Sequence, residues 1–184
     1  MKLARNELKN LMKKKLMQAG LQEAHAETAA EILTWSSERG YHSHGEVRVE
    51  YYCERIAKGG MTIHPHFEWK VTGPCSAIFE GDNGCGYVAA KDAMEKAIDM
   101  ASENGIAVVG IRNISHSGSI GYYTEMAAKK CLQFRFVNPT RWLSRTAAQN
   151  HTTEPTQSPS PRRLLMSASL SSTWPLPCRP GARF

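Results

Sequence analysis

The sequence predicts an α/β protein in which a helical N-terminal part precedes a strand–helix–strand unit. Two observations support this class. Apolar residues recur at helical spacing near the N-terminus, and a continuous apolar run at residues 106–111 follows a further helical stretch, as expected of a buried strand. This order of elements is typical of an α/β chain. With 41% hydrophobic residues among 184, the chain can build a substantial core.

Three helices are predicted in the N-terminal part, each followed by a glycine that can end it. The first follows apolar residues at helical spacing: Leu8, Leu11, Met12 and Leu16. The second covers residues 22–39 and the third about 46–58, with a polar turn at 41–45 between them.

The elements beyond residue 60 alternate between strands and helices. They are, in order, strands over 67–71 and 76–80 around a Gly73-Pro74 turn, a Gly-rich turn over 81–86, a helix over 87–104, the buried strand over 106–111, a polar loop over 113–121 and a final helix.

The charge of the chain divides it into two parts. The net charge of +6 looks at first like a sign of nucleic-acid binding. Residues 1–130, however, hold 16 basic and 16 acidic residues, whereas residues 131–184 hold seven arginines and one acid, Glu154. Seven of the nine prolines also lie beyond residue 130, and no sustained period follows Val137. We therefore expect an ordered part over 1–130, no nucleic-acid partner, and an irregular, disordered tail over 131–184.

Several classes of protein are excluded by absent patterns. No apolar run approaches the roughly 18 residues that a membrane span needs. The Lys-rich N-terminus has no apolar segment of the kind found in secretory signals. The five cysteines are scattered and include no C-x-x-C, which favours a reducing, cytoplasmic setting over a disulfide framework or zinc ribbon.

The first candidate site is the segment SHGEVRVEYY at residues 43–52. If a helix starts near His44, then His44, Arg48 and Tyr52 share one of its faces. The histidine could shuttle a proton and the arginine could hold a carboxylate through two hydrogen bonds, which together suit a small 2-hydroxy or 2-oxo acid. The alternative is an ordinary amphipathic helix with a solvated arginine.

The second candidate site is the sequence SHSG at residues 115–118, which directly follows the buried strand. Ligands in α/β proteins bind in loops at the carboxyl ends of strands, and a histidine placed there could act as a general base. The alternative is a polar turn whose serines cap the next helix.

Two further patterns carry weaker predictions. Residues 84–89 (GCGYVA) fit the dinucleotide pattern G-x-G-x-x-G/A, with Arg112 where NADP would be favoured over NAD, but the preceding strand is short and we expect no Rossmann site. Two H-x-H pairs could bind zinc or manganese, although no carboxylate or cysteine has a matching spacing: His42 with His44, and His64 with His66.

Residues 1–130 resemble the type 2 malate/L-lactate dehydrogenase family, and within it the ureidoglycolate branch. The segments that carry the resemblance are RGYHSHG (39–45), VRVEYY (47–52), ERIAKGG (54–60), GPCSAI (73–78), GIAVVGI (105–111) and HSG (116–118). The resemblance implies a non-Rossmann, homodimeric NAD or NADP enzyme that oxidises a 2-hydroxy acid of the ureidoglycolate, malate or lactate type.

The resemblance also implies roles for the two candidate sites. In the ureidoglycolate branch, the histidine that matches His116 takes the hydroxyl proton, whereas in other branches the histidine that matches His44 has this role. Ser43, Arg48 and Tyr52 match residues of the substrate site. We expect no resident metal, and the cofactor-binding residues of this chain stay unassigned.

The resemblance stops at about Lys130, and a shifted reading frame could explain why. Codons exist for residues 138–149, 151–161 and 173–183 that read, in one shifted phase, as QSDPMVVPYGGA, PYYGTNPIAFA and DMATTVQAWGK, all in the style of the family. We therefore expect residues 131–184 to be out of frame and the chain to be a shortened, inactive form of the enzyme. The alternatives are a small binding or regulatory module, or a metal-binding protein, built on the same N-terminal part.

Overall fold

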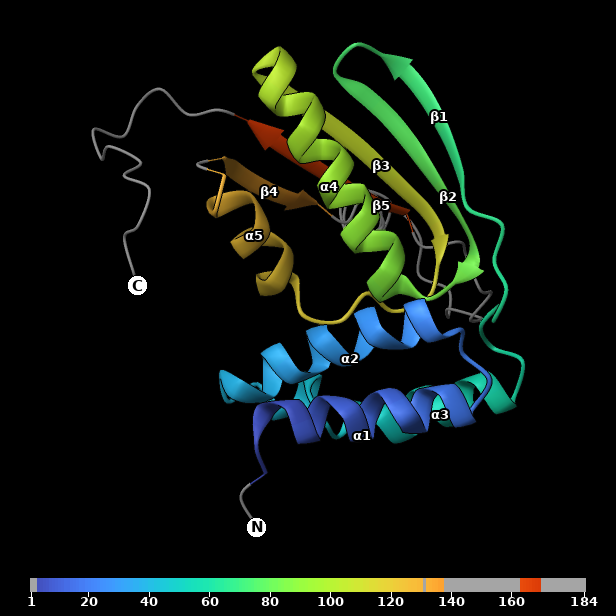
Figure 1. Ribbon diagram of the computed structural model, residues 1–184. Helices are drawn as coiled ribbons and strands as arrows, with labels where there is room; N and C mark the ends of the chain where they lie inside the picture. The colour runs from blue at the N-terminus through green and yellow to red at the C-terminus, as the bar shows by residue number, and fades with distance from the viewer. Residues whose placement is uncertain (1–2, 131, 138–162, 170–184) are drawn as a thin grey trace, which may run out of the picture.

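The computed structural model describes residues 3–130, 132–137 and 163–169. Within these residues the chain forms two layers, which Figure 1 shows one above the other. Three N-terminal helices form one layer, and a sheet with two helices forms the other. This arrangement confirms the predicted α/β class with a helical N-terminal part.

The helical layer contains α1 (Arg5–Gln18), α2 (Glu23–Glu38) and α3 (Arg48–Ala57). A short 3-10 turn, η1 (His42–His44), precedes α3. Our prediction placed the start of the third helix near residue 46, but α3 begins at Arg48. The backbone of residues 42–45 is held instead in a tight turn, in which the N–H of Gly45 donates to the His42 carbonyl oxygen.

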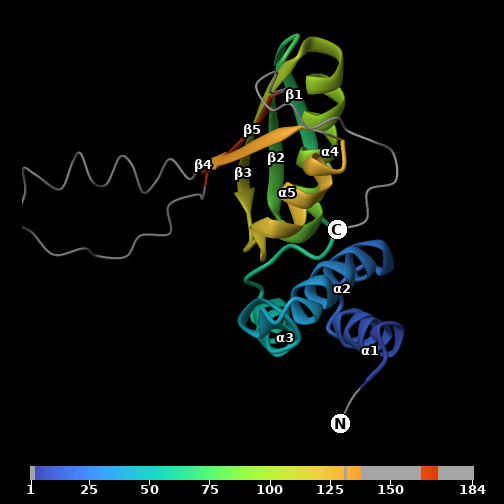
Figure 2. The same cartoon turned by 90° about the vertical axis from the view of Figure 1, so that its left-hand side faces the viewer.

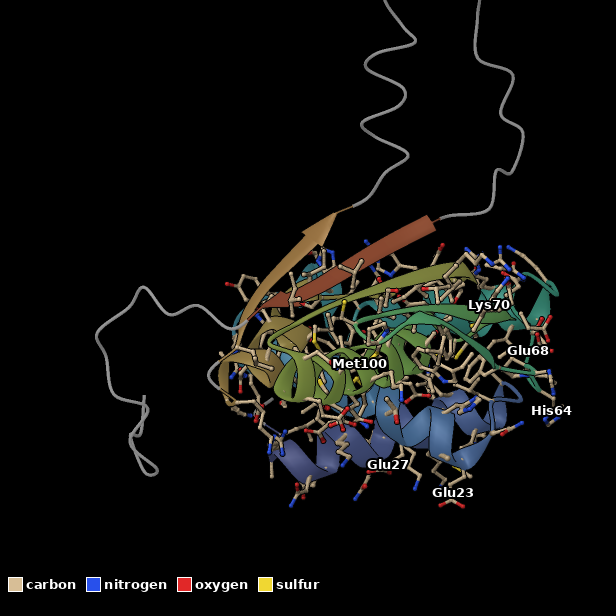
Figure 3. The ribbon with its side chains drawn as sticks, turned by 90° about the horizontal axis from the view of Figure 1, so that it is seen from above. Glu23, Glu27, His64, Glu68, Lys70 and Met100 are labelled. Atoms are coloured by element: carbon tan, nitrogen blue, oxygen red, sulfur yellow. The ribbon has the colours of Figure 1, made fainter. Side chains whose placement is uncertain are left out.

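Two kinds of contact join α1 to α2. Met12 and Leu16 of α1 are buried in the core shared with α2. Lysines of α1 form ion pairs with glutamates of α2, including Lys13 with Glu23 at 2.9 Å, and Figure 3 labels Glu23 and Glu27 on the outer side of this layer. Exposed pairs of this type each contribute only about 0–1 kcal/mol, so the buried apolar residues supply most of the stabilisation.

The sheet has the strand order β1-β2-β3-β5-β4. Its strands are β1 (Glu68–Gly73), β2 (Ser76–Gly84), β3 (Ile106–Ile114), β4 (Gln133–Val137) and β5 (Arg163–Ser169). Strands β2 and β3 are parallel, and the other neighbouring pairs are antiparallel. Helix α4 (Gly86–Asn104) connects the parallel pair, and α5 (Ile120–Ala128) follows β3. Both helices lie on the same face of the sheet (Figure 2).

Helix α4 packs closely on the sheet because its buried face is rich in alanine. Its fully buried alanines are Ala89, Ala90, Ala93, Ala97 and Ala101. The strands place larger side chains opposite them, among which Phe79 of β2 and Val109 of β3 are also fully buried. The predicted buried strand and the helix before it are thus confirmed, and β3 extends three residues beyond its predicted end.

Two segments of the part expected to be irregular form strands. Strand β5 lies antiparallel to β3, and β4 lies antiparallel to β5. Residues 133–137 alternate polar and apolar types, as is typical of a strand. Without β5 beside it, β3 would be an edge strand and would present unpaired N–H and C=O groups. Our predictions for residue 131, residues 138–162 and residues 170–184 lie outside the described part of the chain.

No helix in the described residues combines the length and apolar character needed to cross a bilayer.

Candidate functional site

The two predicted clusters meet at the boundary between the layers. The loop from β3 to α5 carries His116 and passes over the helical layer, which carries Tyr52 on α3 (Figure 1). The Tyr52 hydroxyl lies 2.6 Å from His116 Nδ1. Tyr52 is only 3% exposed, so this contact is formed away from bulk water. A short hydrogen bond of this type fixes the orientation of the imidazole ring.

His44 lies beside this pair. Its ring centroid is 6.1 Å from that of His116, and the two rings are tilted by 31°. Its Nδ1 is 3.0 Å from the Ser43 hydroxyl. Because α3 begins at Arg48, His44 belongs to η1 and is not on the face of α3. The turn before the helix, rather than helical periodicity, therefore brings His44 beside His116.

Arg48 connects the turn to the helix. Its Nε donates to the Ser43 carbonyl oxygen at 2.7 Å, and its guanidinium lies 5.6 Å from the centroid of the Tyr51 ring. The structure therefore gathers all five predicted residues in one region, with Ser43, His44 and Arg48 at its more exposed side.

The loop that carries His116 is held by close packing against α4. The Gly86 N–H donates to the Ser115 hydroxyl at 2.9 Å, and the Ser115 hydroxyl contacts Met61 Sδ at 3.3 Å. A Cβ atom at Gly86 would collide with the carbonyl oxygens of Ser115 and His116. At the other end, the buried Tyr123 hydroxyl donates to the Ser117 carbonyl oxygen at 2.6 Å. These contacts position His116 on a rigid support.

Burial keeps Tyr52 neutral. Removal from water raises the pKa of its phenol well above the ordinary value, while the neighbouring Tyr87 hydroxyl and the Arg48 charge lower it by less. At physiological pH Tyr52 is therefore a hydrogen-bonding phenol. It can donate or accept a hydrogen bond at His116, but it does not act there as an anionic base.

Tyr87 is a neighbour of this site that the sequence patterns did not single out. It is the second residue of α4, is 1% exposed and makes an edge contact with the Tyr52 ring at 5.3 Å between centroids. The one signal in the sequence was a tyrosine directly after the GCG turn, on a helix face otherwise made of alanine and aliphatic residues.

The glycines of the GCG turn pack against the protein itself. A Cβ atom at Gly84 would lie 2.7 Å from Pro65 and 2.8 Å from Phe67, and the Gly86 N–H is bonded to Ser115. Arg112 pairs with Glu80 on the adjacent strand at 2.5 Å. Packing thus explains both glycines, and the turn has the geometry of a strand-to-helix connection rather than of a phosphate cradle.

The histidines of the metal alternative have separate partners. His42 pairs with Glu46 at 2.9 Å, and His64 accepts or donates a hydrogen bond with Gln22 at 2.7 Å. Figure 3 places His64 at the outer edge of the molecule, on the same side as Glu68. Across the described residues, no three side chains of the His, Cys, Asp or Glu types gather as a possible metal site.

Two layers of helices and sheet, with a histidine–tyrosine contact at the loop that follows β3, define the α/β class of this protein. The chain belongs to the malate/L-lactate dehydrogenase family, whose sequence profile matches residues 3–161. The resemblance stated from the sequence is thereby confirmed.

Individual relatives agree with this assignment. The chain is 54% identical over 129 residues to ureidoglycolate dehydrogenase (NAD(+)) of Escherichia coli strain K12, an alignment that covers 70% of this chain and 37% of the relative. It is 36% identical over 129 residues to malate dehydrogenase of Pyrococcus abyssi, again covering 70% of this chain and 36% of the relative. The chain therefore spans little more than a third of the length of these curated relatives.

The solved structures identify the same fold. Malate dehydrogenase from Pyrococcus horikoshii superimposes with a TM-score of 0.71 at 32% identity, covering 75% of this chain and 40% of that one. The predicted non-Rossmann dehydrogenase fold is thus confirmed for the part that matches. The family profile extends past residue 130 to 161, whereas the predicted boundary at 130 and the shifted frame stay predictions.

Proposed function

We propose that residues 1–130 carry the proton-transfer part of a 2-hydroxy-acid dehydrogenase, with His116 as the general base. The observation that carries this proposal is the 2.6 Å contact between His116 Nδ1 and the buried Tyr52 hydroxyl. A histidine held through one ring nitrogen presents the other in a defined direction. The relatives are named for ureidoglycolate and malate, which are both small hydroxy acids.

The chemistry requires two groups to leave the substrate. Oxidation of an alcohol to a ketone removes a hydride from carbon and a proton from oxygen. A neutral His116 accepts the proton and becomes an imidazolium. Tyr52 then stabilises the charged ring by accepting a hydrogen bond from Nδ1. The proton and the hydride together balance the loss of two hydrogens from the hydroxy acid.

Arg48 is suited to hold the substrate carboxylate. Its Nε is used on the Ser43 carbonyl oxygen, so the terminal nitrogens of the guanidinium are the ones that would meet the carboxylate. Ser43 and His44, which lie next to it, would contact the polar substituents of the acid. This arrangement would direct the hydroxyl of the substrate toward His116.

The cofactor in this proposal is NAD, with NADP as the alternative. The name of the E. coli relative includes NAD(+). When bound, NAD would take up the hydride. In the described residues the GCG turn does not fit a pyrophosphate, because its glycines pack on Pro65, Phe67 and the loop that carries His116. We therefore assign no cofactor contact to this part of the chain, and derive only the proton transfer from its residues.

We further propose that residues 131–184 are read in a shifted frame and that this chain has little or no activity. Support comes from the three family-like segments in one shifted phase. The nucleotide sequence around codon 130 tests the idea, because it fails if no single-base shift there opens a long family-like frame. A folded binding module is the alternative, and protection of residues 131–184 in limited proteolysis would favour it.

The test of the catalytic proposal uses the gene with its frame repaired. We expect reduction of NAD or NADP with ureidoglycolate or malate as substrate. Replacement of His116 by alanine should lower kcat by at least about a hundredfold while substrate binding is kept, because general base catalysis typically supplies 10²–10⁴ in rate. His64→Ala, which removes a histidine at the outer edge of the molecule (Figure 3), is the matched control. Full activity of the His116 variant, or an equal loss in the control, would assign the base to another residue.

Two further predictions concern the assembly of the protein, for which the family resemblance is the support, and its location. A homodimer is expected in solution, which sedimentation of the repaired protein would check. A cytoplasmic location is expected from the scattered cysteines, and fractionation of cells that express the protein would check it.

A further inference from the structure

Glu46 is a half-buried residue between the turn η1 and helix α3, and the proposed chemistry does not use it. Both of its carboxylate oxygens have partners on other elements. Oε2 accepts a hydrogen bond from the Ser37 hydroxyl, which lies in the last turn of α2, and Oε1 is 2.9 Å from His42 Nδ1 in η1. Hydrogen bonds to an ionised carboxylate are roughly twice as strong as those between neutral groups. The Glu46 side chain therefore joins η1 to α2.

Glu46 is ionised at neutral pH. Burial alone would raise the pKa of its carboxyl group, but the hydrogen bonds from Ser37, from its own backbone N–H and from His42 together lower it by more, so that this pKa lies below the usual value. An ionised carboxylate can only accept hydrogen bonds, so His42 Nδ1 carries the hydrogen in this contact. The Ser37 hydroxyl also lies 3.0 Å from the Leu33 carbonyl oxygen, but its bond to the charged acceptor is the stronger of the two.

The backbone of the turn also comes close to α2 at this point. The Glu46 N–H donates to the Ser37 hydroxyl oxygen at 3.1 Å, and the neighbouring Gly45 is buried. A Cβ atom at Gly45 would collide with the Ser37 hydroxyl oxygen and would lie 3.1 Å from the Ser37 backbone nitrogen. Ser37 therefore meets both the backbone and the side chain of the segment that follows η1.

The turn that Glu46 holds carries residues assigned to the substrate. Ser43 and His44 belong to η1, and Arg48 Nε donates to the Ser43 carbonyl oxygen at 2.7 Å. A 3-10 turn of three residues has poor hydrogen-bond geometry of its own, so contacts outside the turn are needed to fix its position. A shift of η1 would move all three groups together, away from the rest of the site.

We propose that Glu46 is a positioning residue that holds the η1 turn on α2 through Ser37 and His42. The turn then presents Arg48 and its neighbours in η1 to the carboxylate of the substrate. The meaning of this contact for substrate binding rests on the proposed function, whereas the attachment of the turn to α2 is a property of this chain alone.

The first experiment measures amide hydrogen exchange in the full chain. Glu46→Gln replaces one carboxylate oxygen by an NH₂ group, which cannot accept a hydrogen bond, and removes the charge from the other. The Gly45 N–H, which donates to the His42 carbonyl oxygen at 3.0 Å, should then exchange faster by about tenfold or more, because a hydrogen bond to a charged group is lost and the turn opens more often.

Glu50→Gln is the matched control. It makes the same chemical change one helical turn further along α3, where Glu50 forms an exposed ion pair with Lys15 at 2.9 Å. It should leave the exchange of the Gly45 N–H unchanged. Unchanged exchange in Glu46→Gln, an equal increase in the control, or an equal increase throughout α2 and α3 would overturn the proposed role.

Ser37→Ala tests the same contact from the side of α2. Loss of this hydroxyl should also speed the exchange of the Gly45 N–H. Because both substitutions break one shared contact, the increase in the double variant Ser37→Ala/Glu46→Gln should fall well below the product of the two single increases. Single effects that multiply in the double variant would mean that the two residues act independently, and the attachment through Ser37 would be wrong.

The frame-repaired enzyme provides a functional measurement. Glu46→Gln should raise KM for the 2-hydroxy acid by about tenfold while kcat changes by less than about twofold, because the substrate and the transition state lose the same binding interaction. A fall in kcat at unchanged KM would contradict a role in positioning the substrate site. If the repaired enzyme is inactive, the proposed function fails, but faster exchange confined to the turn still supports the attachment of η1 by Glu46.

Discussion

Replacement of Gly118 by alanine tests whether the loop that carries His116 is held by contact with α4. Gly118 has a φ of +72°, a conformation that favours glycine. The position that a Cβ atom would take at Gly118 lies against the Tyr87 ring, so the added atom would overlap that ring. The ring has little room to move, because Tyr87 is 1% exposed. The substitution therefore combines an unfavourable backbone conformation with a steric collision.

The two effects can be separated by a matched glycine. Gly105 ends α4 with a φ of +79°, and nothing lies within 4 Å of the position where its Cβ would be. Gly105→Ala should therefore lose only the backbone contribution, about 1–2 kcal/mol. Gly118→Ala adds overpacking, which costs about 1–3 kcal/mol, so a total of about 2–5 kcal/mol is expected. This is a large share of the roughly 5–15 kcal/mol that stabilises an ordinary domain.

The assay is urea unfolding followed by tryptophan fluorescence, with Trp35 buried and Trp69 half-exposed as natural reporters. The free energies of unfolding of the two variants are compared with that of the parent at equal m-values. The difference between the variants measures the collision. If Gly118→Ala is no less stable than Gly105→Ala, the packing of Gly118 on Tyr87 does not restrain the loop, and the reasoning about its rigidity is wrong.

Three further predictions concern stability and reactivity. Phe79→Ala should lower the free energy of unfolding by about 3–5 kcal/mol, because Phe79 is fully buried and the cavity is not refilled; urea titration measures this. The ion pair with Lys129 is the largest cause that holds the pKa of Glu125 below its usual value. The stabilisation from this ion pair is fully present above the ordinary pKa of glutamate, and it is lost as the pH falls through the lowered pKa of Glu125. Glu125→Gln should therefore be less stable than the parent at pH 7, by about 0.5–1 kcal/mol. The difference should disappear once the pH has fallen below the lowered pKa of Glu125, as pH-dependent unfolding would reveal. Burial raises the pKa of the Cys85 thiol to about 11, so iodoacetamide at pH 8 should label Cys75 in the native protein and Cys85 only after unfolding, with peptide mass spectrometry as the readout. Native labelling of Cys85 at the rate of Cys75 would contradict its burial.

Local patterns predicted most of the helices and strands, because these elements depend on nearby residues. Helix α4 follows its alanine stripe and ends at Gly105, as expected. The predicted strand at residues 76–80 was too short, since β2 continues to Gly84. Asp82 and Asn83 adopt positive φ, and these residue types are typical of turns, so the pattern indicated a turn where the strand in fact bends.

The candidate site was predicted as two separate clusters, and their meeting could not be derived from sequence spacing. Tyr52 and His116 are 64 positions apart, and only the tertiary fold brings α3 and the loop between β3 and α5 together. Spacing also placed His44 on the helix, whereas its contact with His116 arises from the 3-10 turn before Arg48. Tyr87 was missed because its neighbours in the sequence indicate a Gly-rich turn and a packing helix, and its relation to Tyr52 is purely tertiary.

The position of the site between two layers has a consequence for how the protein would lose function on heating. Tyr52 and His116 are separated by 2.6 Å, and a displacement of about 1 Å between the layers would already break their hydrogen bond. Every helix and strand could persist through such a movement, because each layer has its own internal contacts. Circular dichroism would then report an intact protein at a temperature where the proton transfer proposed for the frame-repaired enzyme has stopped. Enzyme activity would therefore measure whether the helices stay docked on the sheet. Circular dichroism would measure whether each layer keeps its secondary structure.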